Sequence, residues 1–257
     1  MQTLRPQYPT AEDQALAARF LSPLPANTTG IRRKMQSAEV GALRLAPFHV
    51  IRPRKTVSPL AMLSKRIFDI VSALIGLITV SPLLALIAAF VKFDSPGPVF
   101  YSASRAGKNG RIFVCFKLRT MVCDADRMKD NLRARNEREG AFFKMACDPR
   151  ITRIGRVLRR YSLDEIPQLW NVLRGDMSLV GPRPHPLDDF RLYVPQDLRR
   201  LEVTPGITGL WQVTARTDPS FKRNMALDLE YIERWNLLLD IRILYKTIFA
   251  VVRGTGA

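Results

Sequence analysis

The chain has 257 residues, 47% of them hydrophobic, and a formal net charge of +17. This hydrophobic content excludes a wholly disordered protein, and the length suits one domain with an appendage. The positive charge is compatible with three kinds of binding partner: nucleic acid, an anionic lipid surface or a phosphate-rich substrate. It does not distinguish among them. Three cysteines without a C-x-x-C pair predict neither a disulfide framework nor a zinc site.

Residues 1–60 are predicted to form a loosely ordered tail, because they combine many prolines and scattered basic residues with no sustained hydrophobic period. The first residues lack the apolar stretch of a secretory signal peptide. Residues 61–257 are predicted to form one domain, in which the segment at about 66–93 is a membrane helix.

The membrane prediction rests on residues 70–91, which carry no formal charge. A straight helix of that length reaches roughly 33 Å, enough to cross a bilayer. Ser81 and Pro82 lie at its middle, where proline removes a helical hydrogen bond. Basic residues flank both ends, and positive charge favours the cytoplasmic side. The pattern favours a re-entrant helix that bends at Ser81-Pro82, with the Ser81 hydroxyl as a partner for a freed backbone group. A kinked spanning helix and a buried core helix are the alternatives.

The chain beyond Pro98 has a soluble character. Residues 99–121 predict two strands around Lys108-Asn109-Gly110, because Asn-Gly favours a hairpin turn. Residues 124–139 predict a charged helix. Residues 225–252 predict one long amphipathic helix that packs on the core, or else lies in the membrane interface. The fold class is therefore α/β, mostly helical with a small β-hairpin or sheet.

Asp164 and Glu165 are the first candidate site residues. Ser162 and Glu165 match a capping box, and Pro167 suits the first turn of a helix. On this first interpretation, Asp164 and Glu165 are ordinary residues of the first helical turn, where the helix dipole stabilises their negative charge. In the alternative, one carboxylate binds Mg²⁺ while the other attacks phosphorus, and Arg159 neutralises developing charge.

Arg183 is the second candidate, since it lies between Pro182 and Pro184. Proline restricts φ on both sides, so this arginine lies on a stiff segment that suits a bidentate phosphate contact. His185 is predicted to be a surface residue, with substrate contact as the alternative. The role of Trp211 stays open between substrate contact and packing.

Three longer motifs carry a family resemblance: Phe116–Met121 (FKLRTM), Asp148–Pro184 and Pro205–Val213 (PGITGLWQV). In this order they resemble the bacterial sugar transferases, the monotopic phosphoglycosyl transferases. The resemblance runs from about residue 65 to residue 253. It implies a re-entrant membrane helix broken at Ser81-Pro82, and a cytoplasmic catalytic region at about 94–257.

The resemblance also implies roles for single residues. Asp164 corresponds to the family nucleophile and Glu165 to its Mg²⁺ ligand. Arg159 and Arg183 correspond to arginines of the phosphate site. Lys117 and Arg119 match basic residues of the family hairpin motif, where Leu118 replaces the usual phenylalanine without loss of apolar character.

The implied reaction is a ping-pong transfer at the cytoplasmic face of the bacterial inner membrane. A UDP-sugar, with UDP-hexose favoured, donates its sugar-1-phosphate to Asp164 and releases UMP. Undecaprenyl phosphate then accepts the group, which starts exopolysaccharide or glycoconjugate assembly. Mg²⁺ and a lipid bilayer are implied partners, nucleic acid is not, and the sequence leaves a homodimer open.

Two other functions remain as alternatives. A basic, membrane-tethered binding protein without catalysis is disfavoured, because the basic residues surround an acidic pair without aromatic stacking platforms. A membrane-anchored aspartyl phosphatase is disfavoured because the chain lacks a DxDx[TV] nucleophile loop. The motifs do not reveal which sugar is transferred.

Overall fold

The computed structural model describes residues 57–132, 145, 148–187, 193, 197–216, 218 and 220–254. The predicted tail falls almost wholly on residues 1–56, which lie outside the described residues, as does the end of the charged helix predicted at 124–139. The elements, in chain order, are α3 Pro59–Asp94, β1 Phe100–Ala106, η2 Lys108–Gly110, β2 Ile112–Leu118, α4 Ala125–Leu132, α5 Arg153–Arg160, η4 Leu163–Glu165, α6 Gln168–Arg174, β3 Ser178–Val180, η5 Asp197–Glu202, β4 Gly206–Thr208, α8 Leu210–Thr214, α9 Phe221–Arg234 and α10 Leu237–Val252.

The described part is mostly helical with small sheets, as the sequence predicts. β1 and β2 form an antiparallel pair, and β3 and β4 form a short parallel pair. The main apolar core lies where α3, β2, α6, β3, α9 and α10 meet. Its buried members include Ala73, Phe113, Val172, Met177, Tyr231 and Ile243.

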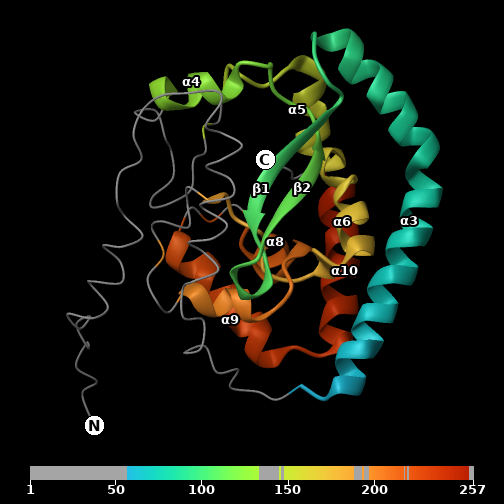
Figure 1. Cartoon of the computed structure of the whole chain (residues 1–257), viewed down its shortest axis with the longest axis vertical. Helices are drawn as coiled ribbons and strands as arrows, with labels where there is room; N and C mark the ends of the chain where they lie inside the picture. The colour runs from blue at the N-terminus through green and yellow to red at the C-terminus, as the bar shows by residue number, and fades with distance from the viewer. Residues whose placement is uncertain are drawn as a thin grey trace.

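α3 is long and apolar enough to cross a membrane, by length and composition. It runs along one side of the molecule on a curved path (Figure 1). Large apolar side chains along its middle remain exposed on the protein surface, which is the pattern of a helix that faces lipid rather than a protein core. They include Leu74, Ile75, Ile78, Leu83 and Leu86.

The helix is continuous through Pro82. Proline cannot donate to the carbonyl four residues earlier, which belongs to Ile78. The Ser81 hydroxyl donates to that same carbonyl oxygen at 2.9 Å. The predicted role of Ser81 is therefore confirmed. Because this bond replaces the missing one, α3 continues through Ser81-Pro82 as one curved helix. The helix break predicted at Ser81-Pro82 is therefore wrong.

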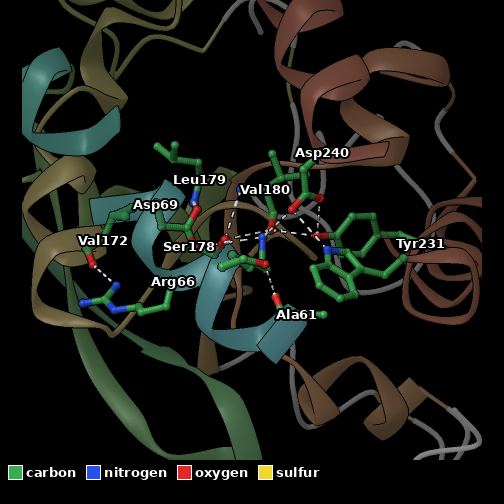
Figure 2. Close-up of polar contacts among 12 residues, drawn as sticks. Ala61, Arg66, Asp69, Val172, Ser178, Leu179, Val180, Tyr231 and Asp240 are labelled. Carbon is green, nitrogen blue, oxygen red and sulfur yellow. Dashed lines mark hydrogen bonds and ion pairs between the residues drawn. The ribbon is translucent and has the colours of Figure 1, made fainter. Parts of the chain in front are cut away.

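The N-terminal end of α3 is held by a buried polar cluster. Lys65 Nζ lies 2.7 Å from Asp240 Oδ2 of α10 and donates to the Val180 carbonyl at 3.1 Å. The Tyr231 hydroxyl donates to the same carbonyl and to Asp240. Asp69 accepts the backbone amide of the residue before Val180 at 3.0 Å. Figure 2 shows Asp69, Val180, Tyr231 and Asp240 gathered at this junction of α3, β3, α9 and α10.

The C-terminal end of α3 docks on the same domain. Asp94 Oδ2 accepts the Ile154 amide in the first turn of α5 at 3.0 Å. Arg119, directly after β2, donates to the carbonyls of Val91 at 3.3 Å and Ser95 at 2.8 Å. An arginine at the end of a helix satisfies its last carbonyls and complements the helix dipole. Both ends of α3 are therefore fixed to one body.

The predicted hairpin is confirmed. Asn109 and Gly110 have φ values of 55° and 72°, which the turn requires. The outer edge of β2 is held by the fully buried Asn171 of α6, which accepts the Phe116 amide at 3.0 Å and donates to the Val114 carbonyl at 2.6 Å. One side chain thus replaces a neighbouring strand and fixes β2 against α6.

The prediction of one helix over residues 225–252 is wrong. The backbone of Trp235 is not helical, and Asn236 caps a new helix by accepting the Leu239 amide at 2.9 Å. Because asparagine favours helix starts, the chain forms α9 and α10 in place of one helix. α10 packs on the core through Asp240 and Ile243, as predicted. Its outer side still exposes apolar residues: Leu238, Ile241, Tyr245, Ile248, Phe249 and Val252.

Candidate active site

The adjacent acids lie in η4, a single 3₁₀ turn between α5 and α6. Ser162, just before them, has a φ of 55°, a left-handed conformation that non-glycine residues rarely adopt. Its hydroxyl caps no amide of η4, so the predicted capping box is wrong; it accepts from Arg216 Nη2 at 2.9 Å instead. Pro167 is the N-cap of α6, close to its predicted place. The turn presents Asp164 and Glu165 beside β2.

Two cations hold Glu165. Lys117 Nζ donates to Oε1 at 2.6 Å, and Arg183 Nη1 donates to Oε2 at 3.1 Å while its Nη2 binds Oε1. Burial raises the pKa of Glu165, but the charges of Arg183 and Lys117 outweigh it and hold the pKa well below its usual range. Glu165 is therefore an ionised, immobilised carboxylate.

Asp164 is held much more loosely. Its Oδ2 lies 3.9 Å from Lys117 Nζ, and its carboxylate makes no hydrogen bond with the described residues. Burial and the neighbouring Glu165 charge raise the pKa of Asp164, while Lys117 and Arg159 oppose the rise. A carboxylate with few hydrogen bonds keeps its lone pairs available, which is the condition for nucleophilic attack.

Arg159 approaches the acids from the last turn of α5. Its Nε donates to the Thr120 hydroxyl at 2.9 Å, which fixes the guanidinium above β2. α5 lies this close because Gly155 has no side chain: a Cβ there would fall 2.1 Å from the Thr120 carbonyl oxygen. Burial lowers the pKa of Arg159, although the Asp164 charge opposes the change. The arginine is thus a fixed positive charge near Asp164.

Arg183 is anchored through its backbone as well. Its carbonyl accepts from Arg200 Nη2 at 2.7 Å, and the same guanidinium pairs with Asp228 at 2.6 Å. Arg200 also contacts His185, which is only 5% exposed, so the surface position predicted for this histidine is wrong. Burial and the charge of Arg200 lower the pKa of His185, which keeps its ring neutral.

Arg216 has no sequence signal that predicts its place in the site. It follows α8, and its side chain is hydrogen-bonded to Ser162, 54 residues earlier in the chain. A contact between such distant segments leaves no local sequence pattern, so only the fold reveals it. Conversely, Arg119 is not brought to the acid pair, because its guanidinium is engaged at the end of α3. The structure thus gathers Lys117, Arg159, Arg183 and Arg216 around the acids.

The acid pair is a suitable, incomplete set of ligands for a hard cation. No group of three metal-ligating side chains occurs in the part of the chain that the structure describes. Glu165 Oε2 accepts one hydrogen bond and retains a lone pair, and Asp164 supplies a second carboxylate in the same turn. Mg²⁺ commonly uses one or two carboxylates and completes its shell with water and substrate phosphates. The residues present therefore fit Mg²⁺.

Comparison with known proteins shows the family of the chain. The family described as "Bacterial sugar transferase" matches residues 60–254. The chain belongs to this family. It is 42% identical to "Exopolysaccharide production protein ExoY" of Rhizobium meliloti (strain 1021), over 216 residues that make up 82% of this chain and 96% of that protein.

Two larger relatives carry more specific names. "Undecaprenyl-phosphate galactose phosphotransferase" of Salmonella typhimurium is 43% identical over 75% of this chain and 41% of its own length. "Undecaprenyl-phosphate glucose phosphotransferase" of Komagataeibacter xylinus is 42% identical over 80% of this chain and 39% of its own length. The chain thus spans nearly all of the first relative and less than half of these two.

Proposed function

We propose that this chain is a phosphoglycosyl transferase that moves a sugar-1-phosphate from a UDP-sugar to undecaprenyl phosphate through Asp164. The observation that carries the proposal is the unequal treatment of two adjacent carboxylates. Glu165 is locked by Lys117 and Arg183, whereas Asp164 accepts no hydrogen bond from the described residues. Two acids in different environments can take different roles at one pH.

In the first half-reaction, an Asp164 oxygen attacks the β-phosphorus of the donor. The new bond joins Asp164 to phosphorus, and the bond from phosphorus to the bridging oxygen of UMP breaks. Arg159 and Arg183 lie where they can stabilise the charge that develops on the phosphoryl oxygens and on the departing UMP. The product is a sugar-phosphoryl aspartate.

In the second half-reaction, an oxygen of the lipid phosphate attacks the same phosphorus. The bond from Asp164 to phosphorus breaks, the carboxylate is restored, and a lipid diphosphate sugar leaves. One site can then serve a water-soluble donor and a membrane-bound acceptor in turn. When bound, Mg²⁺ supplies charge neutralisation for the donor diphosphate, and Glu165 would be its protein ligand.

The names of the relatives support the choice of substrates. Two of them act on undecaprenyl phosphate, one with galactose and one with glucose in its name. A UDP-hexose is therefore the donor class we propose for this chain. ExoY carries exopolysaccharide production in its name, which supports a role in starting polysaccharide assembly.

The arrangement of α3 supports a re-entrant membrane helix. Both of its ends are hydrogen-bonded to the same domain, through Lys65 at one end and Asp94 at the other. A straight spanning helix would carry its two ends to opposite faces of the bilayer. We propose that both ends, and the acid pair, lie at the cytoplasmic face of the inner membrane. Single cysteines at Ser58 and Ser95, treated with a membrane-impermeant thiol reagent in oriented vesicles, should react from the same side; reaction from opposite sides supports the kinked spanning helix.

The proposed activity is tested by UMP release from a panel of UDP-sugars. Enzyme in nanodiscs receives undecaprenyl phosphate and Mg²⁺, with Asp164→Asn as the matched variant. We expect release that requires Mg²⁺, that favours a UDP-hexose and that is lost in the variant. No UMP release with any UDP-sugar, or full activity of Asp164→Asn, would reject the proposed transfer through Asp164. Either result would favour a binding protein without catalysis.

A further inference from the structure

A cleft of about 180 Å³ opens beside the acid pair, between the start of α6, α8 and the C-terminal half of α10. Its polar end is formed by Ser162, Glu165 and Arg216, so it begins at one of the two acids. Side chains from all three helices continue away from that end. They are mostly apolar and include Ile166, Leu169, Val213 and Val251.

The polar groups in the walls of this cleft are largely engaged with each other. The hydroxyls of Thr208 and Thr247 lie 2.8 Å apart in a hydrogen bond, and Thr247 also donates to a backbone carbonyl of its own helix. Gln212 donates its Nε2 to the Ile207 carbonyl at 3.1 Å. Its Oε1 is a buried acceptor without a partner among the described residues. The walls beyond Arg216 therefore suit an apolar ligand better than a polar one.

The cleft also adjoins the membrane helix. Leu169, which lines the cleft, packs against Gly76 in the middle of α3: a Cβ on that glycine would lie 3.3 Å from Leu169 Cδ1. One leucine thus separates the apolar cleft from the helix that carries the lipid-facing surface. A chain that enters from the bilayer beside α3 would find apolar walls that lead to Arg216 and Glu165.

We propose that this cleft holds the acceptor, with its phosphate at Arg216 and its first isoprene units along Ile166, Leu169 and Val213. This inference rests on the proposed transfer function and adds a location for one of the two substrates. The guanidinium complements the phosphate, and the apolar walls remove isoprenoid surface from water. From this place a phosphate oxygen can attack the phosphorus on Asp164 and release the carboxylate.

The polar donor fits this cleft less well. Uracil, ribose, diphosphate and sugar all carry polar groups, which would lose water against apolar walls without gaining partners. Gln212 Oε1 is the one feature that suits the donor, since a nucleobase N–H could donate to it. The experiment must therefore separate the donor half-reaction from the acceptor half-reaction.

Two cleft-filling variants, Ala250→Phe and Val213→Phe, allow this separation. Ile248→Phe is the matched control, because it lies on α10 but is 61% exposed and does not line the cleft. Rapid-quench assays without lipid measure the UMP burst, which reports the donor half-reaction alone. Steady-state assays with undecaprenyl phosphate then give the KM for the acceptor.

We expect both cleft variants to keep the UMP burst within about twofold and to raise the acceptor KM by about tenfold or more, while Ile248→Phe changes neither. A burst slowed about tenfold or more, with an unchanged acceptor KM, would overturn the proposal and place the donor in the cleft. No change in either half-reaction would overturn it as well.

A second measurement covers variants that fail to fold, and does not require turnover. A short prenyl phosphate with a diazirine on its chain is photo-crosslinked to the wild-type protein, and the labelled peptides are mapped by mass spectrometry. Label on peptides that contain Val213 or Val251, competed by undecaprenyl phosphate, supports the acceptor cleft. Label confined to other peptides contradicts it. If the wild-type protein is labelled in this cleft but releases no UMP, the transfer function is rejected, while the proposal of a lipid-binding cleft is still supported.

Discussion

The Arg183 guanidinium holds both carboxylate oxygens of Glu165, with Nη1 at 3.1 Å from Oε2, while the carboxylate of the preceding Asp164 accepts no hydrogen bond from any described residue. The two acids are neighbours in sequence but differ in how tightly they are held. Lys117 sharpens this difference, since its ammonium is 2.6 Å from Glu165 and 3.9 Å from Asp164. The contrast separates a fixed carboxylate from one free to react.

Arg183→Lys tests the bidentate contact. Lysine keeps the charge, but its single ammonium cannot hold both oxygens of Glu165 in a planar fork. We expect UMP release to fall by about 100-fold, the scale of losing one preorganised donor at a transition state. Arg199→Lys is the control, because that arginine pairs with Glu202 and Glu233 away from the acids. Activity of Arg183→Lys near the wild-type level would show that charge alone suffices.

Arg200→Lys tests whether Arg200 acts through Arg183. Through Nη2 the buried guanidinium bridges the Arg183 carbonyl and Asp228, and through Nη1 it contacts His185. Lysine has no second nitrogen, so it cannot keep both sets of contacts. We expect a loss of about tenfold in UMP release, and little further loss when the substitution is added to Arg183→Ala, because residues that act together are not additive. Fully additive losses would indicate an independent effect on the fold. Hydrogen exchange in the peptide that contains Arg183 should also rise.

The pH dependence of the UMP burst rate reports the ionisation of the Asp164 carboxyl group. Burial and the charge of Glu165 raise its pKa, and the nucleophile must be ionised to attack. As pH falls, the burst rate should therefore drop at a pH above the ordinary aspartate value of about 3.9. Glu165, whose pKa is held low, stays ionised through this range. A burst rate that stays constant down to pH values near 4 would contradict the raised pKa.

The ion pair between Lys65 and Asp240, at the start of α3, is expected to contribute to the free energy of unfolding. Lys65→Met leaves the fully buried Asp240 carboxylate without its cation, and such losses cost about 3 kcal/mol. Urea unfolding in detergent should show this loss, and adding Asp240→Leu should restore part of it. Arg234→Met, which removes an exposed pair with Glu230, is the matched control and should change stability very little. Equal effects of the two single variants would contradict the importance of the buried cluster.

Local patterns predicted the elements that depend on neighbouring residues. Asn109-Gly110 predicted the hairpin, and Ser81 partners the carbonyl that Pro82 leaves free. Apart from the helix break at Asn236, which is a local capping signal, and the absence of a break at Pro82, the failures involve contacts between distant segments. Lys117 and Arg119 would share one face of a strand, but β2 ends at Leu118, so Arg119 turns to α3. The left-handed Ser162 and its bond to Arg216 likewise depend on tertiary packing.

The central claim is a covalent link between the sugar phosphate and Asp164. Enzyme mixed with the preferred UDP-hexose and Mg²⁺, without lipid acceptor, is quenched in acid and analysed by intact-protein and peptide mass spectrometry. We predict a mass increase of one hexose phosphate on the peptide that contains Asp164, which disappears when undecaprenyl phosphate is added and is absent in Asp164→Asn. Complete transfer to the lipid with no adduct at any time, or an adduct on another residue, would contradict the account.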